Sequence, residues 1–171
     1  TEIFPPFQGG SGNWFFEMYS RLDSKIVVIT QKIDGKPDVE KVGNLKIYRV
    51  NFAPKSFRDM GLFSIYGIGY YLRLLRLVRS ICKKEQIEVI HCGKVLPEGL
   101  LARLLKFVYG YRYLVYIHGE DIEGALLSRE YKILVNNTLN HTDKVICNSE
   151  NSLILLSKWG HSLLDKAAIL Y

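Results

Sequence analysis

The chain has 171 residues, 48% of them hydrophobic and 23% charged, which is typical of a folded globular domain and too apolar for a disordered chain. Its apolar runs are far shorter than the roughly 20 residues of a membrane-spanning helix, so no transmembrane segment is expected. The formal net charge of +6 favours an anionic partner such as a nucleotide, a phospholipid or a nucleic acid.

Short β-branched runs alternate with amphipathic stretches, which is the pattern of βαβ units and a parallel sheet. In chain order, strands are expected at Thr1–Phe4, Lys25–Thr30, Lys46–Asn51, Ile87–Cys92, Tyr113–His118, Lys144–Asn148 and Ala167–Tyr171. Helices are expected at Asn13–Leu22, Phe63–Lys84, Gly99–Tyr109, Ser128–His141 and Asn151–Trp159. The segment Lys32–Asn44 is expected to be a turn-rich surface excursion. Because the strands are almost continuously apolar, the predicted fold is α/β, a doubly wound parallel sheet with helices on both faces.

Residues 1–171 are predicted to form one domain of a longer protein. Thr1 begins in the middle of an apolar strand, and the last strand ends where a further connection should follow. The start of the chain has neither the basic leader nor the apolar stretch of a secretory signal. Three dispersed cysteines, Cys82, Cys92 and Cys147, are expected to be reduced core thiols, which favours a cytosolic compartment.

The segment Phe4–Asn13 places three glycines, including Gly9 and Gly10, around the start of the first predicted helix. Glycine lets the backbone approach a ligand closely, and a helix N-terminus offers free N–H groups and a positive dipole to a phosphate. A diphosphate-binding loop is therefore one interpretation. The other is an ordinary strand-to-helix turn with glycine at positive φ and Ser11 or Asn13 as the helix cap.

Two common nucleotide-binding motifs do not fit the sequence. An NAD-binding fingerprint needs a further glycine where Phe15 stands, and an acidic residue at the end of the second strand, which closes with Ile29-Thr30-Gln31. A P-loop needs Ser or Thr directly after its lysine, but Val95 follows Gly93-Lys94. The sequence also has no Asp-x-Asp metal motif and no Cys or His cluster at ligand spacing, so no metal site is expected.

His118 ends an apolar strand and is followed by a turn glycine and two acids, Glu120 and Asp121. An imidazole at the carboxyl end of a strand, beside two carboxylates, is suited to hydrogen bonding with a substrate or to proton transfer. The alternative is a capping histidine with solvated acids. Ligands of open parallel sheets bind at the carboxyl ends of strands, which favours the functional interpretation. Lys94 is expected at the same rim, where it would meet a phosphate or an anionic acceptor.

The longest predicted helix has a basic face and an apolar face. The basic side chains are spaced three or four residues apart: Arg73, Arg76, Arg79 and Lys83. The apolar side chains opposite are Leu74, Leu75, Val78, Ile81 and Cys82. A solvated outer face is the default interpretation, and peripheral contact with anionic membrane lipid is the alternative. Nucleic acid is disfavoured because no recognition motif accompanies the basic residues.

Together, these loops resemble the N-terminal, Rossmann-like domain of the family-four retaining glycosyltransferases, also called group 1 glycosyltransferases, which have the GT-B fold. The resemblance covers essentially the whole chain, and the order and spacing of the matching segments make it specific. The matching segments are Phe4–Gly10, the helix running to Leu22, Ile90–Gly93 before Gly99–Ala102, Tyr116–Asp121 and Thr142–Ser149.

The resemblance implies roles for single residues. Gly9 and Gly10 would lie against the donor diphosphate, and His118 would be the catalytic residue near the transferred sugar. Residues expected to contact the acceptor or the sugar are Asn13, Lys94, Glu120 and Asp121. The family's C-terminal donor-binding domain, with its basic pair and Glu-x7-Glu motif, is expected to be absent from this chain. The chain would then be the acceptor-side domain and inactive alone.

The resemblance also implies an activity for the full-length protein. It would be a cytoplasmic transferase of the hexosyltransferase type, active in polysaccharide biosynthesis at the inner face of the membrane. It would take a sugar from a nucleotide-diphosphate sugar and pass it, with retention, to a glycan, lipid-linked or small-molecule acceptor. Positive groups and helix dipoles would stabilise the leaving phosphate, with no cofactor and usually no metal.

Two hypotheses from other classes remain open. One is a stand-alone nucleotide- or phosphate-binding or regulatory α/β module without catalysis. The other is a sugar-nucleotide epimerase of the GT-B type. A natural protein that ends near Tyr171 would contradict the transferase hypothesis, because no room would remain for the donor-binding domain.

Overall fold

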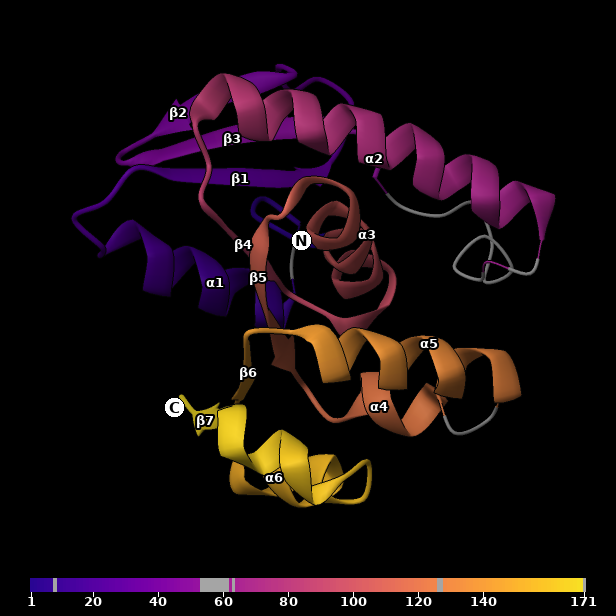
Figure 1. Ribbon diagram of the computed structural model, residues 1–171. Coiled ribbons are helices and arrows are strands. Elements are labelled where there is room, and N and C mark those ends of the chain that lie inside the picture. Colours follow the sequence, from indigo (N-terminus) through magenta and orange to yellow (C-terminus); the bar gives the residue numbers. More distant parts are fainter. Residues whose placement is uncertain (8, 53–61, 63, 126–127, 171) are drawn as a thin grey trace. The chain divides into compact units, whose positions relative to one another are not determined.

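The computed structural model describes residues 1–7, 9–52, 62, 64–125 and 128–170 (Figure 1). The side chains of Glu120 and Asp121 lie outside this description. The chain divides into two compact units, Thr1–Pro54 and Lys55–Tyr171, which are treated separately. Helices accompany parallel strands in both units, which confirms the α/β class expected from the sequence.

The first unit is built on a three-stranded sheet of order β1-β3-β2. β1 (Ile26–Gln31) pairs in parallel with β3 (Leu45–Val50), and α1 (Gly10–Ser20) precedes β1. β2 (Val39–Val42) pairs antiparallel with β3, inside the segment expected to be only a turn-rich excursion. That expectation missed a four-residue strand. Its residues are mostly exposed and form no apolar run, so pairing with β3, and not burial, makes β2 a strand.

The start of the chain differs from its prediction as a strand. Within the described structure, residues 1–4 are not part of a strand, although they are hydrogen-bonded to residues near the end of β1. The terminal amine of Thr1 donates a hydrogen bond to the Ile29 carbonyl at 2.9 Å, and the Thr30 hydroxyl donates to the Glu2 carbonyl at 3.2 Å. These two bonds hold the segment beside β1 without a regular ladder.

The second unit is built on four parallel strands in the order β4-β5-β6-β7 (Figure 1). The strands are β4 (Val89–Cys92), β5 (Arg112–Ile117), β6 (Lys144–Cys147) and β7 (Ala167–Ile169). The connecting helices are α3 (Leu100–Tyr109), α5 (Arg129–His141) and α6 (Glu150–Ser157). Because neighbouring strands in this sheet are parallel, their carboxyl ends and the loops that follow them share one edge.

Four further helical segments are described in this unit, and one of them, Val95–Gly99, leads directly into α3. The 21-residue α2 (Ile65–Glu85) precedes β4 and packs against α3. A short α4 (Glu120–Gly124) directly follows the end of β5, and a turn of 3-10 helix (His161–Lys166) leads into β7. The sequence did not predict the last two segments, since each is too short to show a helical period of apolar residues.

The core of the second unit consists of the β5 side chains and the apolar faces of the helices. Tyr113, Val115 and Ile117 are fully buried, as are Leu105 and Leu139 on the helices. The three cysteines are also buried and free, which confirms their prediction as core thiols. Burial raises the pKa of the Cys82 thiol to about 11, so this thiol stays protonated and unreactive at neutral pH.

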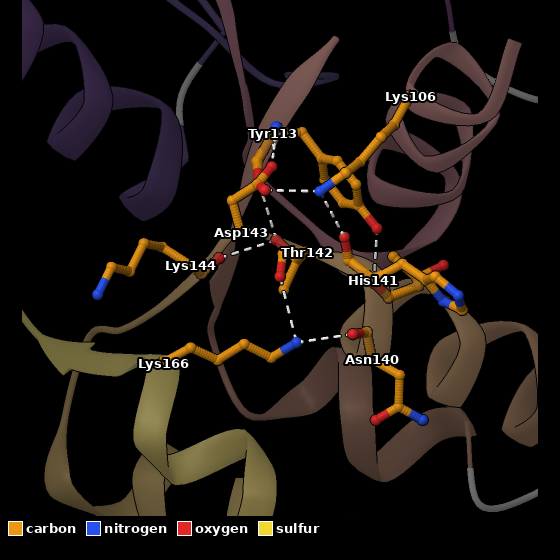
Figure 2. A network of polar contacts seen from close by, with 9 residues as sticks. Lys106, Tyr113, Asn140, His141, Thr142, Asp143, Lys144 and Lys166 are labelled. Atoms are coloured by element: carbon orange, nitrogen blue, oxygen red, sulfur yellow. Dashed lines mark hydrogen bonds and ion pairs between the residues drawn. The ribbon is translucent and has the colours of Figure 1, made fainter. Parts of the chain in front are cut away.

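A polar network joins β5 to β6 at their amino ends (Figure 2). The Asp143 carboxylate accepts hydrogen bonds from Lys106 Nζ at 2.6 Å and from the Tyr113 backbone N–H at 2.8 Å. The Asp143 N–H donates in return to the Tyr113 carbonyl at 2.9 Å. Lys166 Nζ donates to the carbonyls of Asn140 and Thr142, at 2.9 and 3.2 Å. The segment between α5 and β6 is therefore held from both sides.

Candidate functional site

His118 and Asn148 follow neighbouring strands at the carboxyl edge of the second unit. Ile117, the last residue of β5, pairs in register with Cys147, the last residue of β6, so the next residues of both strands lie side by side. The amide nitrogen of Asn148 lies 3.3 Å from Nδ1 of His118. An amide NH2 group can only donate, so Nδ1 accepts and the neutral imidazole carries its proton on Nε2.

The first turn of α6 fixes the orientation of the Asn148 amide. The Ser152 hydroxyl donates a hydrogen bond of 2.7 Å to Asn148 Oδ1. With Oδ1 held by Ser152, the amide nitrogen of Asn148 points toward His118. Ser152 is itself buried, and its backbone N–H donates to the hydroxyl of Ser149, the N-cap of α6. A chain of polar contacts thus runs from the cap of α6 through Ser152 and Asn148 to the imidazole. We name Ser152, Asn148 and His118 the carboxyl-edge triad.

Gly119 makes the turn that follows His118. Its φ of +91° is a backbone conformation that glycine adopts easily, and it is the N-cap of α4. A Cβ built on Gly119 would lie 3.5 Å from Leu155 Cδ1 and 3.8 Å from Ser152 Oγ, so this turn lies against α6. The backbone of Glu120 and Asp121 forms the start of α4, while the predicted contacts of their side chains fall outside the described residues.

The loop after β4 carries Lys94 at the same edge. Glu98, which is buried, accepts hydrogen bonds from the backbone N–H groups of Gly93 at 2.5 Å and Lys94 at 3.2 Å. The carboxylate therefore fixes the loop backbone from which the half-buried Lys94 side chain extends. Sequence analysis missed Glu98. Glu98 lies four residues after Lys94, in the first turn of the helical segment Val95–Gly99. An acidic residue near the start of a helix often caps backbone N–H groups, and this pattern could have indicated Glu98 from the sequence.

In the first unit, the glycine loop differs from the ordinary turn considered as an alternative. α1 begins at Gly10, with Gly9 as an N-cap of extended φ (−177°) that provides no side-chain cap. Ser11 and Asn13 lie within the helix, so neither is its cap, and the exposed Asn13 is in its first turn. Because glycine has no capping side chain, the start of α1 has the form of helix N-terminus to which anions bind in other proteins.

Gly9 and Gly12 are required by packing against Ile3. A Cβ on Gly12 would lie 2.9 Å from the Ile3 carbonyl oxygen, and one on Gly9 would lie 2.8 Å from Ile3 Cγ2. A Cβ on Gly10 would meet no atom within 4 Å. Close packing against the Ile3 side chain at Gly9, and against the Ile3 backbone at Gly12, therefore accounts for these two glycines but not for Gly10.

Comparison with known proteins identifies the family. The sequence model described as Glycosyltransferase Family 4 matches residues 8–165. The chain belongs to Glycosyltransferase Family 4. A protein of Methanocaldococcus jannaschii, whose name describes it as an uncharacterized glycosyltransferase, is 24% identical to this family-four chain over 105 residues. The matched segment covers 61% of the family-four chain and 29% of that relative, so the chain spans less than a third of the relative's length.

A buried arginine of the family-four chain contacts the start of the glycine loop. Arg49, on β3, is only 3% exposed, and its Nη2 donates to the Pro5 carbonyl at 2.9 Å. Its Nε donates to Glu40 at 3.0 Å, and the two side chains form an ion pair between β3 and β2. Sequence analysis missed both residues, because the pairing of β2 with β3 that brings them together was not predicted.

The basic face predicted on α2 is present in the family-four structure. Arg73, Arg76, Arg79 and Lys83 are all exposed. Leu74, Val78, Ile81 and Cys82 are buried on the opposite side, and Leu75 is half-buried. Arg79 also interacts within the protein, since its guanidinium lies 4.0 Å from the ring centre of Tyr109 on α3. The two-sided character of this helix is thus confirmed.

The first turns of α2 present exposed apolar side chains that the sequence analysis did not single out. Ile65 is 87% exposed and Tyr66 is 81% exposed, and Ile68 and Leu72 are exposed as well. Apolar residues thus precede the basic face along the same helix. Within the described residues, none of the helices combines the length and apolarity needed to span a bilayer.

Proposed function

We propose that this family-four chain is the acceptor-binding half of a retaining glycosyltransferase. The enzyme would transfer a sugar from a nucleotide-diphosphate sugar to a glycan, lipid-linked or small-molecule acceptor. The observation that carries this proposal is the carboxyl-edge triad, in which the His118 ring is oriented by Asn148 and Ser152 at the ligand-binding edge of a parallel sheet. Family membership supplies the reaction class.

The proposed role of His118 is a hydrogen bond from Nε2–H to a hydroxyl group of the transferred sugar. Asn148 acts as a positioning residue, since it holds the ring through Nδ1. Lys94, whose backbone is fixed by Glu98, would attract an anionic group at the same edge. Glu120 and Asp121 would contact sugar hydroxyls through their carboxylates, which accept hydrogen bonds well.

The proposed role of the glycine loop is to bind the donor diphosphate. The N-terminus of α1, with glycine as its N-cap, would present N–H groups and a positive dipole end, and Gly10 leaves open space for a phosphate oxygen to approach. Such preorganised positive groups stabilise the negative charge that develops on the leaving diphosphate. Asn13, exposed in the first turn of α1, is suited to contact the acceptor or the sugar.

The test is a donor screen on the full-length protein that contains this chain. Each nucleotide sugar is supplied with an acceptor mixture, and transfer and hydrolysis are measured for the unaltered protein and for His118→Ala. We expect a loss of about 100-fold or more in turnover, the usual scale for a group that acts directly in the reaction. The matched control is His141→Ala, because His141 is exposed at the opposite end of the strands.

Three outcomes would contradict this proposal. Equal turnover by His118→Ala and the unaltered protein would remove His118 from the site. Epimerised nucleotide sugar without transfer would favour the epimerase hypothesis. A transferred sugar with inverted anomeric configuration, as measured by NMR of the product, would contradict retention.

We further propose that α2 contacts anionic membrane lipid from the cytoplasmic side. The exposed Ile65 and Tyr66 would enter the headgroup region, and Arg73 and Arg76 would interact with lipid phosphates. Arg73→Glu combined with Arg76→Glu should abolish co-sedimentation with phosphatidylglycerol vesicles. Lys36→Glu combined with Lys41→Glu, at exposed positions in the other unit, is the matched control. Unchanged sedimentation of the α2 variant would exclude this face.

A further inference from the structure

A groove of about 540 Å³ lies in the second unit between α5 and the residues that follow α6. Its lining residues are Arg129, Lys132, Ile133, Asn136, Lys158 and Trp159. The first four are spaced three, four and seven residues from Arg129, so they form one face of α5. None of the six belongs to the carboxyl-edge triad or to the other residues assigned above.

Three positive charges face this groove, and among the described residues none of them has an acidic partner. Within the described part of the chain, Arg129, Lys132 and Lys158 form no ion pair with a carboxylate. Other cations of this chain do form such pairs, for example Lys106 with Asp143. Like charges gathered on one surface repel one another and raise the local positive potential. The groove therefore attracts anions.

Two of these cations, Arg129 and Lys132, lie at the N-terminal end of a helix, where positive charge is unfavourable. Arg129 is the first residue of α5 and Lys132 is in its first turn, where the helix dipole disfavours positive charge. Lys158, by contrast, follows α6, where a cation is favourable. A bound anion changes the balance for the first two, because the dipole and both side chains then attract the same negative group.

The groove also offers apolar surface beside its charges. The Trp159 indole is half-buried, and Ile133 is half exposed on the same face as Lys132. An indole and a branched aliphatic chain favour a planar or apolar group, while the cations favour an anionic one. We propose that this groove binds a phosphate ester whose phosphate contacts Arg129, Lys132 and Lys158 and whose organic group packs on Trp159 and Ile133.

The phosphate could belong to a soluble ester or to a lipid headgroup, and the experiment separates these sources. Trp14→Phe removes the other tryptophan of the chain, so that emission reports on Trp159 alone. Phenyl phosphate is titrated into this background in one arm, and phosphatidylglycerol vesicles in the other. We expect a saturable change in Trp159 emission in at least one arm. Phenol, which has the ring but no phosphate, should give no such change.

Substitutions in the groove test the role of its charges. Arg129→Ala combined with Lys132→Ala should weaken binding by about tenfold or more, since charge-assisted hydrogen bonds to phosphate are lost. Lys158→Ala, on the other wall, should weaken binding as well and provides a second variant if the first fails to fold. Lys36→Ala combined with Lys41→Ala, which removes the same charge from exposed positions in the other unit, is the matched control.

The outcome in each arm decides the proposal. Phenyl phosphate binding that depends on the groove residues supports a soluble ester, and vesicle binding with the same dependence supports a lipid phosphate. The absence of a saturable change in both arms would overturn the proposal. Equal weakening by the Lys36 and Lys41 control and by the groove variants would overturn it too, because binding would then depend on net charge alone.

Discussion

Asn148 and His118 are separated by 29 intervening residues, yet the Asn148 amide nitrogen lies 3.3 Å from the imidazole Nδ1. This contact exists because β5 and β6 pair in parallel and end in register, at Ile117 and Cys147. The orientation of the ring therefore depends on the sheet and on the first turn of α6, and not on the loop that contains His118. The same relationship makes Asn148 a testable positioning residue.

Asn148→Ala should lower kcat in the full-length protein by about 10- to 100-fold with little change in KM, because the ring loses its fixed orientation. Ser152→Ala should have a smaller effect in the same direction, since the Asn148 amide then loses its hydroxyl donor. Asn151→Ala, at an exposed position in the first turn of α6, is the control. Steady-state kinetics on the preferred donor measure all three variants. A change confined to KM would contradict the positioning role of Asn148.

Gly10→Ala and Gly12→Ala should separate ligand binding from folding. The Gly12 variant should lose about 1–3 kcal/mol of unfolding free energy, because its Cβ would overlap the Ile3 carbonyl group. The Gly10 variant has open space and should unfold at the same denaturant concentration or a slightly higher one. Its Kd for the donor should nevertheless rise, because the methyl group occupies the proposed phosphate position. Denaturant unfolding and donor titration provide the two measurements, and an unchanged donor Kd for Gly10→Ala would place the diphosphate elsewhere.

Glu98→Ala should destabilise the protein by about 2–3 kcal/mol, because two backbone N–H groups lose a charged acceptor. Glu98→Gln should cost less, since its amide oxygen still accepts a hydrogen bond. Glu88→Ala is the control, because the Glu88 side chain is 86% exposed and surface substitutions usually change stability by less than about 0.5 kcal/mol. Urea unfolding measures the three free energies. Equal losses of unfolding free energy for Glu98→Ala and Glu88→Ala would contradict a stabilising role for the hydrogen bonds that Glu98 accepts from Gly93 and Lys94.

The stability of the protein should depend on Asp143 at acidic pH. Partial burial alone would raise the pKa of Asp143, but hydrogen bonds from Lys106 and the Tyr113 N–H hold it below its usual value. A carboxylate with a depressed folded-state pKa stabilises the fold above the unfolded-state pKa of about 3.9. This stabilisation is lost as the pH falls through the lower folded-state value.

Asp143→Asn should therefore cost about 1 kcal/mol at pH 7, a modest figure because the Asp143 side chain is 38% exposed and partly screened by solvent. The difference between the variant and the unaltered protein should shrink as the pH falls from about 5 toward 2. Asp165→Asn, at an exposed carboxylate, is the control. Denaturant unfolding at several pH values tests this, and a constant difference across that range would contradict it.

Apolar periodicity was sufficient to predict the central elements of the fold. The expected helix Ser128–His141 is α5 with Ser128 as its cap, and the expected strand Tyr113–His118 is β5 shifted by one residue. The elements that were missed depend on other forces. β2 forms through backbone pairing of exposed residues, and α4 is too short to show a helical period of apolar residues. The helix expected at Asn13–Leu22 is present as α1, which begins three residues earlier, at Gly10.

The candidate site was predictable only to the level of loops. The carboxyl-end rule placed His118 and Lys94 at one edge of the sheet, because it needs only the order of the strands. The contacts of Asn148 and Arg49 require strand register and pairing, which the sequence does not display. The Ser149-x-x-Ser152 spacing is a capping signal, and it could have directed attention to the residues that follow β6.

The network around Asp143 has a consequence for how this protein can evolve. It ties the amino ends of β5 and β6 together with an ion pair and backbone hydrogen bonds. The register of β5 and β6 therefore does not depend only on residues 118–124, the turn and short helix at the other end of β5. Substitutions at Glu120 and Asp121 are therefore expected to disturb strand pairing little, whereas Gly119, at φ +91°, and Ile122, which is 1% exposed, are constrained by the fold. Libraries that test the proposed sugar and acceptor contacts are best directed to Glu120 and Asp121, with Gly119, Ile122 and the amino-end residues left untouched.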